Sequence, residues 1–457
     1  MLKLLTLILV ILVDLARNEV YKSPEQIHLS LGESPNEMVV TWITQQNTNS
    51  TIVEYGEKEF DKFEKGSSIK FTDGGPERRE FFNHRVVLRD LKPGTMYIYH
   101  CGSPDGGWSS VYFFRAIKDG SHWSPRFAIY GDMGNVNAQS LSRLQEEVQR
   151  GHFDAILHVG DFAYNLDTDD AKVGDAFMNQ IQSIAAYVPY MTCAGNHEQN
   201  YNFSNYMSRF SMPKAQGDGH NMFFSFDIGP VHFISFSSEY YYFTKYGWNQ
   251  IANQYRWLES DLKKANLPER RKKTPWIIAM FHRPLYCSNA DDPEHCTNAE
   301  NIIRIGFPFG EDYGIEKLLY KYGVDVAFQA HEHAYERMWP VYNLTVCNGS
   351  ANNPYLNPSA PVHIVTGSAG CQEGVDPFLP LPNTWSAFHS DDYGYARMTV
   401  LNSSHLHIEQ VSDDQNGKVI DSMTLIKNKH GAGTYNCHER NLKQTSPLKG
   451  PAKMKFT

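Results

Sequence analysis

The sequence predicts a two-domain chain, with an N-terminal all-β sandwich followed by an α/β domain in which a β-sheet sandwich is flanked by helices. Three observations lead to this fold class. Short alternating strands with turn residues between them fill residues 24–118. Apolar runs typical of buried strands alternate with amphipathic segments over residues 124–427, and a hairpin-like segment interrupts that alternation. A length of 457 residues alone allows about three domains, so both predicted domains fit within the chain.

The first domain is predicted from its regularly spaced strands. The predicted strands are residues 26–31, 38–42, 51–55, 84–88 and 97–101. Residues 91–97, which read Leu-Lys-Pro-Gly-Thr-Met-Tyr, resemble the tyrosine corner of fibronectin type III domains. A fibronectin type III-like sandwich is therefore expected here, without chemistry of its own.

The second domain is predicted from apolar runs of the kind that are covered on both faces. These runs are residues 127–130, 155–159, 190–194, 276–281 and 324–330. Residues 140–148 and the segment around Tyr255, Leu258 and Leu262 have helical apolar spacing. Residues 223–228 and 231–236 favour a hairpin, so the sheet should be mixed. Apolar and polar residues alternate again over 395–425, which predicts strands that complete a second sheet. The polar, basic composition of 428–457 predicts a disordered tail.

Residue types that bind metals stand at or just beyond the end of each apolar run. They are Asp132 after the first run, Asp161 and Tyr164 after the second, Asn196 and His197 after the third, His282 after the fourth, and His331 and His333 after the fifth. Taken singly, each is compatible with an ordinary turn, cap or loop. Because the carboxyl ends of such strands are where α/β sheets bind ligands, five in succession favour a metal centre.

In order and spacing, these blocks resemble the five metal-binding blocks of the purple acid phosphatases, which are calcineurin-like metallophosphoesterases. Residues 331–337 and 287–291 resemble those of the long animal form of that family, and long members also carry an N-terminal sandwich. The resemblance implies two metal sites that share Asp161 as a bridging ligand. The first site would contain Asp132, Asp161, Tyr164 and His333, and the second would contain Asp161, Asn196, His282 and His331.

The resemblance also implies the metals. The Tyr164 phenolate suits Fe(III), with a visible charge-transfer colour. The second ion would be Fe(II), Zn(II) or Mn(II), because a mixture of oxygen and imidazole ligands suits all three. A trivalent ion lowers the pKa of bound water further than a divalent one, which suits activity in acid.

The expected reaction is attack of metal-bound hydroxide on a phosphate monoester, with Asp161 bridging the metals. Asn196 and His197 would bind substrate, and His197 would stabilise the phosphoryl charge, oriented by Glu198 or Asp167. Plant relatives place paired histidines after the position of His282, but this chain lacks them. His295 is the nearest candidate for the general acid, and an ordinary exposed loop histidine is an equally good interpretation.

Two other functions stay open. The same site could serve a phosphodiesterase or nucleotide pyrophosphatase, or the chain could be a non-catalytic binding glycoprotein with a vestigial site. The net charge of -9 and the absence of a basic stripe argue against nucleic acid as a partner. The expected substrate is a phosphate monoester, either a small molecule or a phosphoprotein. The oligomeric state is open.

The N-terminus predicts export. Residues 1–20 are read as a signal peptide, because the apolar run 4–13 is too short to span a membrane. Five sequons support secretion, at Asn49, Asn202, Asn343, Asn348 and Asn402. The C-terminus lacks the hydrophobic segment of a GPI anchor, so no stable membrane anchor is expected. The chain is expected outside the cell or in the endolysosomal lumen.

The sequence also suggests several structural roles. Seven cysteines cannot all pair within one chain, and the first pairings to consider are Cys287 with Cys296 and Cys347 with Cys371. Glu336 and Arg337 are read as an ion pair, and His363 as a core histidine. The family's usual glycine before His331 is Ala330 here, which requires a negative φ.

Overall fold

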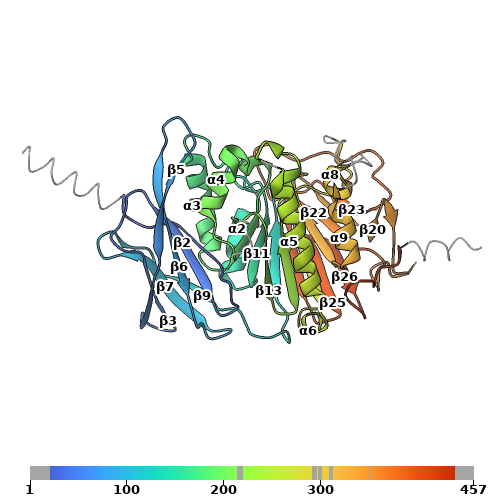
Figure 1. Ribbon diagram of the computed structural model, residues 1–457, viewed down its shortest axis with the longest axis horizontal. Helices are drawn as coiled ribbons and strands as arrows, with labels where there is room; N and C mark the ends of the chain where they lie inside the picture. The colour runs from blue at the N-terminus through green and yellow to red at the C-terminus, as the bar shows by residue number, and fades with distance from the viewer. Residues whose placement is uncertain are drawn as a thin grey trace, which may run out of the picture.

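The structure is a computed structural model, and it describes residues 21–213, 220–246, 248–290, 296, 301–307, 312–350 and 352–437. The predicted signal peptide, His295 and the chain from residue 438 lie outside these ranges. A β-sandwich forms one end of an elongated molecule, and a larger sheet-and-helix domain forms the rest (Figure 1).

The N-terminal sandwich contains two antiparallel sheets. One has the order β1 (Glu25–Leu31), β2 (Met38–Thr44), β6 (Glu80–Leu88), β5 (Ser67–Thr72). The other has the order β4 (Lys62–Lys65), β3 (Ile52–Gly56), β7 (Met96–Ser103), β8 (Gly107–Trp108), with β9 (Tyr112–Arg115) also paired to β7. The backbone N–H of Lys92 donates to the Tyr97 hydroxyl at 3.0 Å, which is the hydrogen bond of a tyrosine corner. The predicted sandwich is confirmed, and the strands that the sequence pattern missed are β4, β5, β8 and β9.

The sandwich is fixed to the second domain through helix α3 (Lys172–Ala185) and the residues after it. The Tyr99 hydroxyl donates to the carbonyl of Ala186 at 2.7 Å, and the Ile27 N–H donates to Gln182 at 2.9 Å. The fully buried Arg209 of the second domain donates to the side-chain oxygen of Gln26 in the sandwich at 3.0 Å. Buried polar contacts of this kind hold the two domains in a defined orientation.

The second domain contains two facing mixed sheets. The first has the order β12 (Tyr190–Cys193), β11 (Ala155–Val159), β10 (Arg126–Tyr130), β24 (Gly394–Val400), β25 (His405–Ser412), β26 (Lys418–Ile426). The second has the order β13 (Phe224–Ile228), β14 (Val231–Ser235), β15 (Trp276–Met280), β18 (Val326–Gln329), β22 (Val362–Thr366), β19 (Tyr335–Met338), β23 (Ser386–Ser390). The predicted β13–β14 hairpin is antiparallel, and β14, β15, β18 and β22 run parallel.

Apolar side chains fill the space between these sheets, and helices cover their outer faces. The rings of Phe127 and Phe233, one from each sheet, lie 4.9 Å apart. On the first sheet, Tyr395 donates to Glu147 of α2 (Leu141–Gln149) at 2.8 Å. On the second, Ser225 donates to Asp261 of α5 (Asn249–Ala265) at 2.8 Å. Both predicted amphipathic segments are therefore helices. Among the described helices, none combines the length and apolar character needed to cross a bilayer.

Shorter elements complete the domain. The helices are α4 (Asn200–Arg209), α6 (Pro268–Lys273), α8 (Ile302–Ile305) and α9 (Ile315–Lys321), with 3-10 turns η1 (Asn196–Glu198), η2 (Glu239–Tyr241) and η3 (Thr244–Tyr246). The remaining strands are β16 (Gly306–Phe307) with β17 (Asp312–Tyr313), and β20 (Val341–Tyr342) with β21 (Thr345–Val346).

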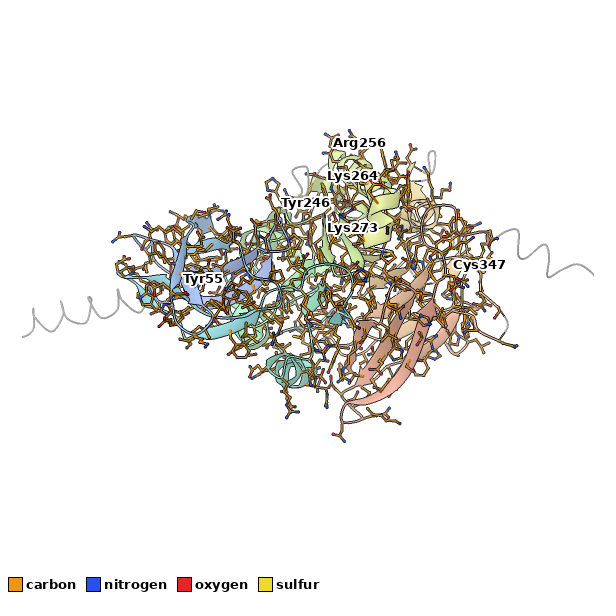
Figure 2. The ribbon with its side chains drawn as sticks, turned by 90° about the horizontal axis from the view of Figure 1, so that it is seen from below. Tyr55, Tyr246, Arg256, Lys264, Lys273 and Cys347 are labelled. Atoms are coloured by element: carbon orange, nitrogen blue, oxygen red, sulfur yellow. A yellow bond between two sulfur atoms is a disulfide. The ribbon has the colours of Figure 1, made fainter. Side chains whose placement is uncertain are left out.

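The start of the predicted disordered tail is ordered. The Tyr435 hydroxyl is buried and donates to the Val324 carbonyl at 2.7 Å, and Cys437 forms a disulfide with Cys347. Figure 2 shows Cys347 at the end of the molecule remote from Tyr55 of the sandwich. The tail prediction is wrong for residues 428–437, because two buried side chains anchor a segment whose average composition is polar.

The disulfides correct a second prediction. Cys287 and Cys296 are bonded, as considered from the sequence. Cys347 pairs with Cys437, so the suggested Cys347–Cys371 bond is wrong, and Cys371 is a buried free thiol.

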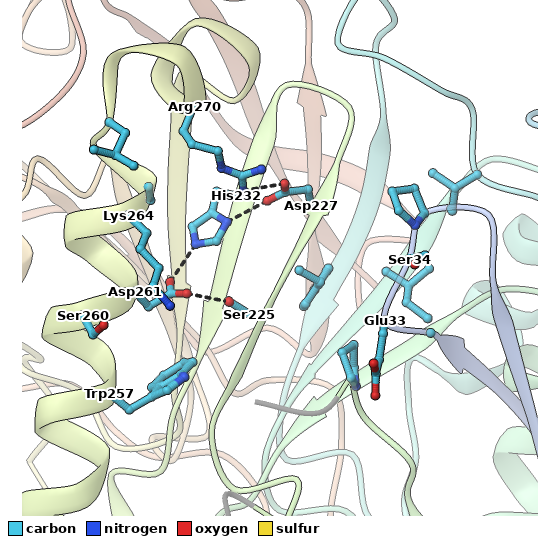
Figure 3. A pocket seen from close by; sticks show the side chains of 18 of the residues that line it. Glu33, Ser34, Ser225, Asp227, His232, Trp257, Ser260, Asp261, Lys264 and Arg270 are labelled. Carbon is cyan, nitrogen blue, oxygen red and sulfur yellow. Dashed lines mark hydrogen bonds and ion pairs between the residues drawn. The ribbon is translucent and has the colours of Figure 1, made fainter. Parts of the chain in front are cut away.

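A cavity of about 730 Å³ lies between the sandwich and the second domain, away from the predicted metal ligands. In its wall, both ring nitrogens of His232 hydrogen-bond to carboxylates (Figure 3). Nδ1 lies 2.7 Å from a carboxylate oxygen of Asp227, and Nε2 lies 2.8 Å from one of Asp261. Arg270 pairs with the other oxygen of Asp227 at 2.7 Å. Burial lowers the pKa of His232, but the two carboxylates outweigh burial and raise the pKa to about 9.

Alkaline pH should therefore remove the stabilisation that His232 supplies. A histidine pKa raised from 6.5 to about 9 on folding contributes stability that is fully present below pH 6.5 and is lost as pH rises through 9. The shift corresponds to on the order of 3 kcal/mol. We expect the gap in melting temperature between the native chain and His232→Gln to narrow between pH 6 and pH 10. A gap that is constant over this interval would contradict the charged state of His232.

Candidate metal centre

The carboxyl ends of strands from both sheets meet at one edge of the second domain. The loops after β10, β11 and β12 carry Asp132, Asp161, Tyr164, Asn196 and His197. The loops after β15 and β18 in the facing sheet carry His282, His331 and His333. The structure brings together all of these side chains, which the sequence predicted only as strand-end residues.

One group of side chains gathers around Tyr164. Its hydroxyl lies 3.3 Å from Oδ1 of Asp132 and 2.8 Å from Nε2 of His333. That histidine nitrogen lies 3.6 Å from the same Asp132 oxygen. A carboxylate, a phenol and an imidazole therefore direct their donor atoms at one small volume.

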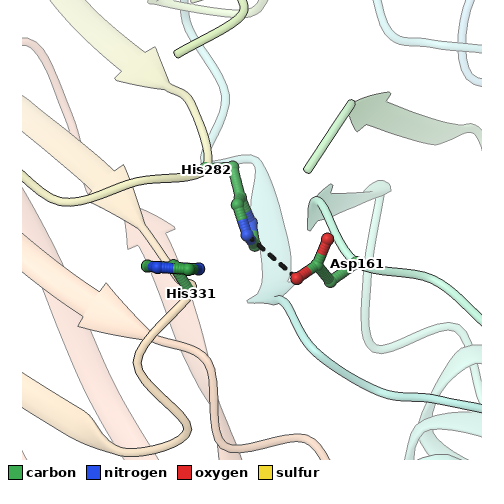
Figure 4. Close-up of side chains that lie close together, drawn as sticks. All are labelled: Asp161, His282 and His331. Atoms are coloured by element: carbon green, nitrogen blue, oxygen red, sulfur yellow. Dashed lines mark ion pairs between the residues drawn. The ribbon is translucent and has the colours of Figure 1, made fainter. Parts of the chain in front are cut away.

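A second group gathers around His282. Its Nε2 lies 3.1 Å from Oδ2 of Asp161 and 3.1 Å from the amide oxygen of Asn196. Asp161, His282 and His331 each offer a donor atom, and these three atoms lie within 4.8 Å of one another (Figure 4). The first group contains three of the four residues of one ligand set that the family resemblance implies, and the second group contains all four residues of the other.

The backbone at the site adopts unusual conformations. Asp132, Asp161, Tyr164 and His331 all have positive φ, between 52° and 75°. Non-glycine residues rarely adopt this conformation, and it costs on the order of 1 kcal/mol or more at each position. Gly160, with φ of 90°, admits the ring of His282, since a Cβ there would lie 2.4 Å from its Nδ1. The φ of Ala330 is not positive, so an alanine fits at this position, where the family usually has glycine.

Burial and close charges shift the pKa values of the acidic and basic groups. Burial raises the pKa of Asp132 well above its usual range. Burial also acts to raise the pKa of Asp161, but the positive charge and the hydrogen bond of His282 outweigh burial. The pKa of Asp161 is therefore below its ordinary value. Burial lowers the pKa of His282, and Asp161 outweighs this effect and raises it to about 10. A metal ion bound among these groups would favour the charged form of both carboxylates.

Comparison with known proteins identifies the family. Residues 24–116 match the model of the purple acid phosphatase N-terminal domain, 125–335 match calcineurin-like phosphoesterase, and 360–422 match iron/zinc purple acid phosphatase-like protein C. Acid phosphatase type 7 of Danio rerio is 53% identical over 418 residues, which is 90% of this chain and 93% of that protein. The human protein of the same name is 52% identical, with the same two coverages. This chain belongs to the purple acid phosphatases.

A solved structure of the family supports the same fold. The purple acid phosphatase PPD1 from yellow lupin seeds matches with a TM-score of 0.75 at 26% identity, covering 94% of this chain and 78% of that one. The two-domain arrangement and the metallophosphoesterase fold therefore agree with those predicted from the sequence.

Two contacts orient the donor groups of this purple acid phosphatase. The Nδ1 of His282 donates to the Val159 carbonyl at 2.8 Å, so Nδ1 keeps its proton and Nε2 is the nitrogen that would lose its proton to bind a metal. The buried carboxylate of Glu198 accepts backbone N–H groups from Asp161, Phe162 and Gly195 at 2.8 to 3.0 Å. Glu198 thereby joins the loops after β11 and β12.

Replacing Glu198 by glutamine should weaken this arrangement. The amide NH₂ cannot accept a hydrogen bond, so at least one of the three buried N–H groups loses its acceptor. We expect a loss of about 1–3 kcal/mol of stability and a 10–100-fold weaker affinity for metal. Thermal unfolding and metal titration measure both effects, with the exposed Glu146→Gln on α2 as a control. An unchanged metal affinity would show that the Glu198 contacts are dispensable.

His197 has a different partner from those considered from the sequence. Its Nδ1 lies 3.1 Å from the side-chain oxygen of Asn165, and its Nε2 lies 3.8 Å from Glu373. Neither Glu198 nor Asp167 orients the ring, because Glu198 binds backbone N–H groups and Asp167 accepts from Asn200 at 3.1 Å. The backbone N–H of His197 donates to Asp161 at 2.9 Å, which ties His197 to the proposed bridging residue.

A pocket of about 250 Å³ opens beside these groups. It is lined by Asp161, Asn196, His197, His331, Glu332, His333, Glu373 and Asp376. Glu373 and Asp376 are not among the predicted site residues, and Asp376 accepts the His333 N–H at 2.6 Å. Their loop follows Cys371, far from the five motifs, and carries no strand-end pattern that could have revealed them.

Two structural roles predicted near the site have different outcomes. Arg337 pairs with Asp421 of β26 at 2.7 Å, so the predicted Glu336–Arg337 pair is wrong. Successive residues on a strand point to opposite faces, which keeps these two apart. His363 is buried in β22 beside Gln329 at 3.0 Å, and burial lowers its pKa to about 3, as expected for a core histidine.

Proposed function

We propose that this purple acid phosphatase is a secreted or lumenal enzyme that hydrolyses phosphate monoesters in acid at a dinuclear, iron-containing centre. The observation that carries the proposal is the pair of donor groups described above. Asp132, Tyr164 and His333 form one group, and Asn196, His282 and His331 form the other around Asp161.

The donor chemistry fits two metal ions. Tyr164, as a phenolate, and Asp132 are hard oxygen donors that suit Fe(III). The other group, rich in imidazole, suits Fe(II), Zn(II) or Mn(II). When bound, such a pair supplies Lewis-acid charge that activates water and stabilises a phosphoryl group.

The protein's own residues would then bind and orient the substrate. Asn196 and His197 line the pocket, and the imidazole of His197, held by Asn165, is directed toward a phosphoryl oxygen. The acidic rim residues Glu373 and Asp376 disfavour substrates that carry further negative charge beyond the reacting phosphate.

Residence outside the cytosol is supported by two kinds of observation. Disulfides such as Cys287–Cys296 and Cys347–Cys437 persist in oxidising compartments. The sequon residues Asn49, Asn202, Asn343 and Asn402 are exposed, and Asn348 is half-buried. Mass spectrometry of the protein secreted by an animal cell line would identify the glycosylated sites.

A visible absorption spectrum with metal analysis tests the centre. We expect a broad visible band and two metals per chain, with the band lost or strongly shifted in Tyr164→Phe, because the phenolate is the proposed iron ligand. Tyr55→Phe in the sandwich is the matched control. A colourless protein with two metals would refute the tyrosinate-iron assignment and leave general metallophosphoesterase chemistry.

Substrate assays separate the alternatives. Faster turnover of an aryl phosphate than of a bis-aryl diester supports the monoesterase. The reverse order would indicate a phosphodiesterase, and no turnover by the metal-loaded protein would indicate a binding protein.

A further inference from the structure

Asp376 lines the pocket at the candidate metal centre and lies against the predicted ligand His333. Its carboxylate accepts the backbone N–H of His333 at 2.6 Å, and its own backbone N–H donates to the His333 carbonyl at 3.3 Å. The two residues are 43 positions apart in the chain. This reciprocal pair of hydrogen bonds ties the backbone of a ligand residue to a loop outside the five motifs.

The same carboxylate also faces the ring of His333. The Nε2 of that ring lies 2.8 Å from the Tyr164 hydroxyl, so it is the nitrogen that faces the other proposed ligands. The Nδ1 of the ring lies 3.7 Å from Oδ2 of Asp376 and 3.5 Å from Sγ of Cys371. If Nε2 binds a metal, the ring proton has to be on Nδ1, and a nearby carboxylate stabilises that tautomer. Asp376 therefore acts on both the backbone and the ring of His333.

The loop that carries Asp376 is held by the loop that follows β15. The fully buried Asn289 donates from its side chain to the Asp376 carbonyl at 3.2 Å. The Ala290 N–H donates to the Pro377 carbonyl at 2.8 Å. Because Asp376 precedes a proline, its backbone is also biased toward extended conformations. A loop that is preorganised in this way holds His333 with little further loss of entropy when a ligand binds.

We propose that Asp376 is a positioning residue of the first metal site, which sets the orientation and the tautomer of His333 and so raises the affinity of that site for its metal. This inference rests on the proposed function and extends it to a loop beyond the five motifs. Charge alone is a different explanation, because any carboxylate near the site attracts a cation. Glu373 separates the two explanations. It belongs to the same loop and the same pocket wall, but its side chain lies 3.8 Å from His197 instead.

The test measures how tightly the metal-loaded protein holds its metals in competition with EDTA, and it records the visible absorption band of each variant. We expect Asp376→Ala to weaken the affinity for one of the two metals about 10–100-fold and to shift the band, because the carboxylate contacts with His333 are lost. Asp376→Asn keeps an oxygen that can accept the His333 N–H but loses the charge beside Nδ1, so its effect should be smaller. Glu373→Gln, the matched control, should keep the native metal affinity and band.

Unchanged metal affinity and an unchanged band in Asp376→Ala would overturn the inference. An equal loss of affinity in Glu373→Gln would also overturn it, since charge alone would then explain the effect. A loss of stability lowers the amount of folded protein but does not move the band, so the band separates positioning from folding. If Asp376→Ala does not fold, Asp376→Asn carries the test. A native protein that holds two metals without a visible band leaves the affinities to decide, whereas one that holds no metal refutes the proposed function and this inference with it.

Discussion

Replacing Asp161 by asparagine is expected to lower kcat/KM for an aryl phosphate by about 10³-fold or more. Asp161 is fully buried between the two donor groups, and its carboxylate contacts His282 at 3.1 Å and the His197 N–H at 2.9 Å. An asparagine amide has the same shape but no charge and a single oxygen, so it cannot bridge two cations. Metal analysis should show fewer than two metals per chain.

The control for this experiment is Asp391→Asn, because Asp391 is exposed in the turn between β23 and β24. It should retain native metal content and activity. If Asp161→Asn bound two metals and kept a rate near that of the native enzyme, Asp161 could not be the bridging ligand, and the assignment of the two donor groups would have to be revised.

Removal of the Cys347–Cys437 disulfide, by Cys347→Ser together with Cys437→Ser, is expected to lower the free energy of unfolding by about 4.5 kcal/mol. The bond closes a loop with a sequence separation of 90 residues, whereas Cys287–Cys296 closes one of only 9. The entropy removed from the unfolded chain grows with loop length, so loss of the shorter disulfide should cost less, about 2.7 kcal/mol.

The second double variant is Cys287→Ser with Cys296→Ser. Chemical denaturation of both double variants, with and without reductant, measures which disulfide contributes more to the free energy of unfolding. Reductant breaks both bonds, so in its presence the native protein and the two variants should have similar, lower stabilities. The prediction is contradicted if removing the short-loop disulfide lowers the free energy of unfolding more, or if removing the long-loop disulfide does not lower it. Either result would show that Cys347 and Cys437 are not bonded, or that their bond does not restrict the unfolded chain.

Local patterns were sufficient to predict the sheets and the ligand candidates. The apolar runs at 127–130 and 155–159 are covered on both faces in the structure, so their composition directly reflects their environment. The strand-end position of Asp161 is a local property as well, and parallel topology then brings it beside its counterparts. Strands such as β4, which reads Lys-Phe-Glu-Lys, were missed because they are short, polar and at a sheet edge.

Pairings between distant segments could not be predicted in this way. Asn165 was not singled out as the partner of His197, because the geometry of two loops decides that contact. Asp421 binds Arg337 across 84 positions, and Cys437 reaches Cys347 from a segment with polar composition. In each case the local sequence carries the chemical group, but only the folded chain selects its partner.

The donor groups also have a mechanical role, since they come from two different sheets. Apolar contacts such as Phe127 with Phe233 are non-directional and tolerate small sliding movements between layers. Metal coordination has a defined geometry and opposes such sliding, so binding at this edge locks one layer against the other. Resistance of the chain to proteolysis should thus follow the supply of metal in the compartment where it matures.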